Sequence, residues 1–172
     1  MPSRFRWFVL GIVATAVAFA VGAYLFVESG GVSMETTAKP LPLEATLAHM
    51  ALRASIGDAG EQKSPIAFND ANLTAGAHIF KERCAFCHGL PQQPPTDASR
   101  GMFPPPPQLF VHDQMVTDDP AGVTYWKVTH GIRLSGMPGF PEVLNDTQRW
   151  QVTMLVAHAD KLSPAVLAEL RP

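Results

Sequence analysis

The feature that most constrains this chain is an uncharged segment near its N-terminus. Residues Phe8 to Val27 contain no Asp, Glu, Lys or Arg. At about 1.5 Å per residue, a helix of that length spans roughly 30 Å, the thickness of the hydrocarbon core of a bilayer. The sequence therefore predicts a transmembrane helix within an anchor region at residues 1–28.

The charges that flank this segment predict its orientation. Arg4 and Arg6 precede it and Glu28 follows it. Because basic residues stay on the cytoplasmic side, we expect the rest of the chain on the other side of the membrane. A cleaved signal peptide is the alternative, since small residues such as Ala18 and Ala20 lie within the segment. The apolar part of a signal usually runs only about 7–15 residues, so we favour an uncleaved single-pass anchor.

The part that follows the anchor is small and rich in loops. A chain of 172 residues has room for one compact domain with appendages, and 16 prolines and 13 glycines argue against a long helical bundle. A small core usually needs a metal, a disulfide or a cofactor to stabilise it. The net charge is −2, or −4 once Arg4 and Arg6 are set aside, and no basic cluster indicates a nucleic-acid partner.

Residues 29–68 are expected to form a linker that contains one short amphipathic helix. Gly30-Gly31 and the prolines at 40 and 42 are typical of linker sequence. Between the second proline and Gly57, four apolar residues recur at helical spacing: Leu43, Leu47, Met50 and Ala54. Two interpretations stay open for this helix, packing on the flank of the domain, which we favour, or docking to a partner or the membrane surface.

Residues 69–172 are expected to fold as an all-helical domain. Helices are predicted to start at Asn69 or Asp70 and at Asn145 or Asp146, to span Ala121–His130, and to begin once more after Ser163-Pro164. Between them, the stretch 90–111 ends in Pro104-Pro105-Pro106-Pro107, which cannot continue a helix.

The two cysteines lie in one motif, Cys84-Ala85-Phe86-Cys87-His88, which is the attachment pattern of haem c. Positions i, i+3 and i+4 of a helix share one face. Two thiols can therefore add to the vinyl groups of one porphyrin while the imidazole of His88 reaches its iron. A thioredoxin-like cysteine pair would need a βαβ context, and a zinc site would need a second ligand pair, and neither is present. We predict one covalently bound haem c per chain.

Over roughly residues 69–161 the chain resembles class I c-type cytochromes, in particular the membrane-anchored monohaem forms of bacteria. The residues that carry the resemblance are Gly76, Phe80, Cys84, Cys87, His88, the four prolines, the segment His130–Pro138 and Trp150. It implies a cytochrome c-like fold, anchored in the inner (cytoplasmic) membrane with the haem domain in the periplasm.

Met137 is the predicted sixth ligand of the iron. It lies in a loop rich in glycine and proline after a helix, where no helical neighbour crowds the thioether. The resemblance indicates the same residue. Met102 and Met115 flank the proline loop and stay open as alternatives from spacing alone, and His130 is the best candidate for bis-histidine ligation.

The resemblance also implies residues around the haem. A backbone carbonyl of the proline loop, assigned to Pro106, would accept the second N–H of His88, as ligating histidines usually require. Arg133, Tyr125 and Trp126 would bind the haem propionates, because arginine matches a carboxylate and tyrosine and tryptophan carry donors.

These features predict a one-electron carrier that relays electrons between membrane or periplasmic redox proteins, as a free carrier or as a subunit of a respiratory complex. The cofactor carries the chemistry, so no catalytic residue and no small-molecule substrate are expected. The alternative is a haem enzyme or gas sensor with an open sixth site.

Overall fold

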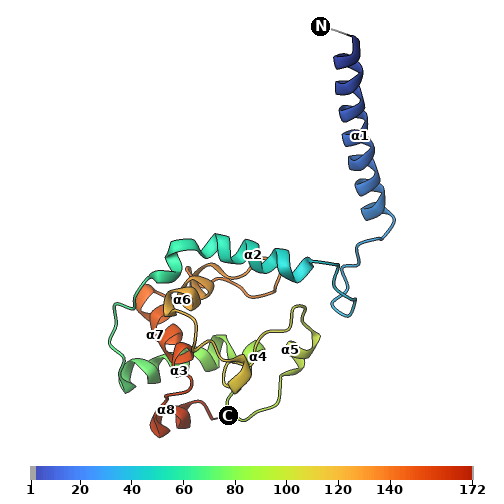
Figure 1. Cartoon of the computed structure of the whole chain (residues 1–172). Helices are drawn as coiled ribbons and strands as arrows, with labels where there is room; N and C mark the ends of the chain where they lie inside the picture. The colour runs from blue at the N-terminus through green and yellow to red at the C-terminus, as the bar shows by residue number, and fades with distance from the viewer. Residues whose placement is uncertain (1–2, 172) are drawn as a thin grey trace. The chain divides into compact units, whose positions relative to one another are not determined.

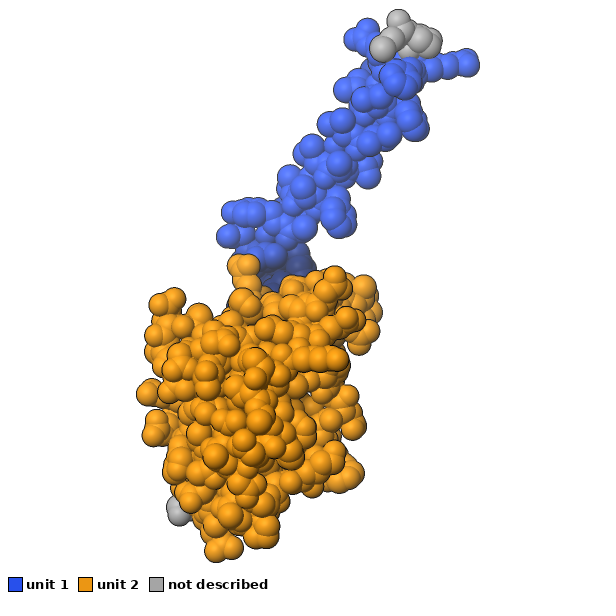
Figure 2. All heavy atoms as spheres, turned by 90° about the vertical axis from the view of Figure 1, so that its left-hand side faces the viewer, with its two compact units in different colours: residues 1–42 blue, residues 43–172 orange. Residues whose placement is uncertain are grey.

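The computed structural model describes residues 3–171, and contacts divide the chain into two compact units, residues 1–42 and 43–172 (Figure 2). All the regular elements in the described part are helices, and one isolated β-bridge joins Ile132 and Met137 (Figure 1). The all-α prediction is confirmed.

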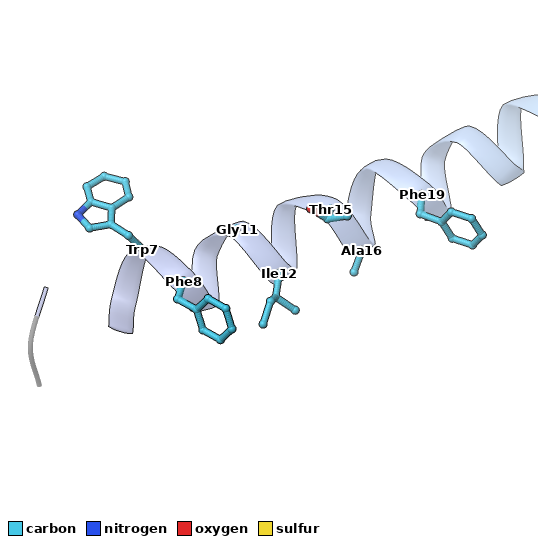
Figure 3. Close-up of a pocket in the computed structure, with 7 residues that line it drawn as sticks. All are labelled: Trp7, Phe8, Gly11, Ile12, Thr15, Ala16 and Phe19. Atoms are coloured by element: carbon cyan, nitrogen blue, oxygen red, sulfur yellow. The ribbon is translucent and has the colours of Figure 1, made fainter. Parts of the chain in front are cut away.

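Unit 1 contains the predicted anchor. Helix α1 (Ser3–Glu28) exposes all its side chains, and among residues 3–171 it alone is long and apolar enough to cross a membrane, a property that a signal sequence shares. A concave strip runs along this helix from Trp7 past Gly11 to Phe19 (Figure 3). Its walls are successive turns of one helix, and it is separate from the cysteine motif in unit 2.

Unit 2 contains the remaining elements. They are α2 (Glu44–Ile56), η1 (Gly57–Glu61), α3 (Asp70–Arg83), α4 (Ala85–His88), α5 (Asp97–Gly101), η2 (His112–Gln114), α6 (Ala121–His130), α7 (Asp146–Ala157) and α8 (Pro164–Glu169). The side chains of Asn69, Asn145 and Ser163 accept backbone N–H groups at the starts of α3, α7 and α8. These caps satisfy donors that a helix start otherwise leaves unpaired.

The core is built where α3 crosses α7. A Cβ atom at Gly76 would lie 2.3 Å from the carbonyl oxygen of Gln151, so only glycine permits this approach. Leu73, Phe80 and Leu155 are buried around the crossing. Because α3 ends at Arg83, the crossing fixes the point from which the cysteine motif starts.

A second contact joins η1 to α6. A Cβ at Gly122 would lie 2.4 Å from the carbonyl oxygen of Gly60 and 2.7 Å from that of Gln62. The end of the segment expected to be a linker thus lies directly against α6, inside unit 2. The domain boundary expected at residue 69 stays a prediction.

Candidate functional site

The cysteine motif forms one helical turn. The backbone N–H of Cys84 donates to the carbonyl of Phe80 at 2.9 Å, which continues the end of α3. The N–H groups of Cys87 and His88 donate in turn to the carbonyl of Cys84, at 3.1 and 2.9 Å. These bonds give positions 84, 87 and 88 the i, i+3, i+4 relation of a shared helical face. Both thiols are free and half-buried.

Burial sets the protonation of these groups. It raises the pKa of the Cys84 thiol to about 12, with a smaller contribution from Cys87, so this thiol is protonated at neutral pH. Burial also lowers the pKa of His88, and the hydrogen bond to Pro107 only partly offsets this. The imidazole of His88 is therefore neutral, which is the form that ligates metals.

The carbonyl of Pro107 orients the His88 ring. It accepts from Nδ1 at 2.8 Å, and since a carbonyl cannot donate, the Nδ1 atom carries the proton. The lone pair of His88 then lies on Nε2. The acceptor belongs to the Pro104–Pro107 stretch, as the resemblance implied, whereas the carbonyl of Pro106 accepts from the Gln108 side chain at 3.4 Å.

A second contact joins the proline loop to the motif, and it was not predicted from the sequence. Gly89 has a φ of +69°, and a Cβ there would lie 2.4 Å from Oε1 of the buried Gln108. The Gln108 backbone N–H donates to Oε1 of Gln114 at 2.8 Å. The glycine that directly follows the motif is the one local hint of this packing. The loop is thus held against the end of α4 at two adjacent points.

The Met137 loop folds back on the end of α6. The Ile132 N–H donates to the carbonyl of Met137 at 3.0 Å, and the Phe140 N–H donates to the carbonyl of Val128 at 3.0 Å. At Gly131, with a φ of +69°, a Cβ would meet the carbonyl of Met137 at 2.7 Å. The backbone of Met137 is therefore fixed by contacts that require glycine, and its side chain is half-buried.

Met102 lies against the same loop. A Cβ at Gly136 would be 2.8 Å from Cε of Met102, and Gly136 has a φ of +76°. The structure thereby brings Met102 and the Met137 loop together. Other methionines lie elsewhere: Met154 is buried in the core, and Met34 and Met50 are 86% and 62% exposed.

The residues expected at the propionates have different surroundings. The Tyr125 hydroxyl donates to Asp146, and its ring stacks on Trp150 with centroids 4.0 Å apart. Trp126 is half-buried beside His130, with ring centroids 4.9 Å apart. Arg133 is exposed, and no ion pair forms with it among residues 3–171. The propionate roles of these three residues stay predictions. A propionate would have to compete with Asp146 for the hydroxyl of Tyr125.

The donor set fits haem c. Two unbridged thiols and a neutral, oriented imidazole lie on one helical turn, which is what covalent attachment and axial ligation need. In the described part of the chain, no three His, Cys, Asp or Glu side chains gather to hold a metal ion by themselves.

Among models of known protein families, one matches part of this chain. The model of the family described as "Cytochrome C oxidase, cbb3-type, subunit III" matches residues 71–154. The match runs from α3 into α7 and includes the cysteine motif, the proline loop and the Met137 loop, while α1, α2 and η1 lie outside it. No curated protein and no solved structure gives a significant match.

Proposed function

Residues 71–154 form a cytochrome c domain, and on this premise we propose that the chain is a monohaem, membrane-anchored electron carrier with His/Met ligation. The observation that carries the proposal is the hydrogen bond from Nδ1 of His88 to the carbonyl of Pro107, at 2.8 Å, directly after two free cysteines at the attachment spacing. This bond leaves Nε2 as the ligating atom of a neutral ring.

Each part of the site has a role in holding the cofactor. Cys84 and Cys87 would attach it through thioether bonds, and His88 and Met137 would bind its iron. When bound, haem c supplies one-electron oxidation and reduction. A thioether ligand raises the reduction potential relative to a second imidazole, which suits a carrier of moderate to high potential.

We place the domain on the periplasmic side of the inner membrane, with α1 as an uncleaved single-pass anchor. Arg4 and Arg6 before the apolar segment support this orientation. Its partners are then membrane or periplasmic redox proteins. The description of the matching family, as an oxidase subunit, supports a place in a respiratory complex.

Spectra of the Met137→Ala variant test the proposed ligation. The oxidised wild-type protein should show the weak sulfur-to-iron charge-transfer band at the red end of the visible spectrum, and the reduced protein should bind carbon monoxide poorly. Met137→Ala should abolish the band, open the iron to carbon monoxide and lower the potential, because the stabilising thioether is lost.

Matched changes at other methionines serve as controls. Met115→Ala should leave the band in place, and Met154→Ala should do so at some cost in packing stability, since that residue is buried. A wild-type protein that is high-spin and takes up carbon monoxide readily would contradict a closed site and favour a haem enzyme or gas sensor.

A further inference from the structure

Helix α2 carries apolar residues on two opposite sides. At about 100° per residue, Leu52 and Ile56 lie roughly half a turn away from Leu47 and Met50. Ile56 is buried and Leu52 half-buried, so this side faces the domain. Leu47 and Met50 point the other way and are 60% and 62% exposed.

The exposed side forms a continuous stripe. Leu43, which precedes the helix, is 68% exposed and has a φ of +66°, a backbone conformation that is rare for leucine. It falls in register with Leu47, Met50 and Ala54, and we call these four residues the outer stripe. Single exposed apolar residues are normal, but an apolar stripe on the outside of a surface helix indicates that something covers it.

The chain itself limits what can cover the outer stripe. The fifteen residues 29–43 join the end of α1 to the start of α2. Even fully extended they reach only about 50 Å, so a retained anchor keeps α2 within that distance of the bilayer. Tethering gives a high effective concentration, so even a weak affinity for lipid is enough to hold the helix there.

The chemistry of α2 suits a lipid interface. Polar Thr46, His49 and Arg53 line one edge of the outer stripe and Ser55 lies beyond the other, which is the arrangement of helices that lie in a membrane surface. Glu44 and Arg53 cancel in charge, so burial of apolar side chains drives the contact and anionic lipid is not required.

We propose that the outer stripe of α2 docks on the bilayer surface and thereby holds the haem domain in a fixed orientation. The proposal rests on the retained anchor proposed above. It is distinct from the site, because α2 lies outside the segment that matches the cytochrome family.

Electron paramagnetic resonance of the oxidised full-length protein tests this in oriented phosphatidylcholine multilayers that contain no other protein. The haem signal should vary with the angle between membrane and field, since the domain is docked. Leu47→Ser combined with Met50→Ser should reduce that variation several-fold. Val143→Ser, at a loop residue that is 59% exposed, is the matched control and should leave it unchanged.

Three results would overturn the proposal. The first is a wild-type domain that is unoriented in these bilayers, and the second is a double variant that stays oriented. The third is orientation that appears only in native membranes, which would assign the outer stripe to a protein partner. Alkaline carbonate extraction of the same samples reports separately on the anchor. Haem orients the signal in either spin state, so a wrong sixth ligand does not affect this test.

Discussion

Gly136 precedes the predicted ligand Met137 and has a backbone conformation that favours glycine. The residue has a φ of +76°, and a Cβ there would lie 2.8 Å from Cε of Met102. The glycine next to the predicted ligand thus meets a conformational requirement, whereas its neighbour Met102 is the flexible end of a side chain and can move. Met102, left open as a ligand from spacing, has a packing role at this position.

We expect Gly136→Ala to lower the free energy of unfolding by about 1–3 kcal/mol, because alanine is strained at a positive φ. Urea unfolding of the oxidised protein measures the loss, and a weaker red-end charge-transfer band should accompany it. Gly101→Ala is the control, since a Cβ there meets nothing within 4 Å, and it should change stability little. Equal stability of both variants would contradict the packing described.

Local chemistry made several residues of the fold predictable from sequence. Asn69, Asn145 and Ser163 were expected at helix starts because their side chains can accept backbone N–H groups, and all three do so. The contacts of Gly89 with Gln108 and of Gly136 with Met102 were not predicted. Each of these contacts joins segments that are brought together only in the folded chain. No hydrophobic periodicity or capping residue in the sequence therefore predicts it.

At the scale of elements, the crossing of α3 and α7 positions the site. The α6 bounds, Ala121–His130, agree with the prediction, because a glycine ends the helical pattern at residue 131. The packing of η1 on α6 could not be predicted, since the segment has no helical period and lies in what composition indicated to be linker. The η1 segment is ordered by its contact with α6 and not by its own helix propensity.

We expect Gly76→Ala to destabilise the domain by about 1–3 kcal/mol or more, because a Cβ at 2.3 Å from the Gln151 carbonyl oxygen forces the two helices apart. The loss should appear in urea unfolding and in a lower thermal midpoint. Ala71→Ser, at an exposed position of the same helix, should stay within about 0.5 kcal/mol of the parent. Full tolerance of Gly76→Ala would show that the crossing is looser than described.

At the scale of the whole molecule, the fate of α1 decides whether the carrier is tethered or free. With the anchor retained, the mature protein should keep its N-terminus and stay with the membranes after an alkaline carbonate wash, since about 20 apolar residues resist extraction. N-terminal sequencing and fractionation measure this. A soluble mature chain that begins after Ala20 or Ala23 would identify the segment as a cleaved signal.

The contact between Gly60 and Gly122 has a consequence for where the protein can be cut. Excising only the stretch that matches the cytochrome family would remove η1 from α6 and leave the Gly122 face of that helix open to water. We therefore expect an excised domain to need η1 in addition to residues 71–154, the segment that matches the family model. A truncated form of this domain is therefore best started near Leu43, where unit 2 begins.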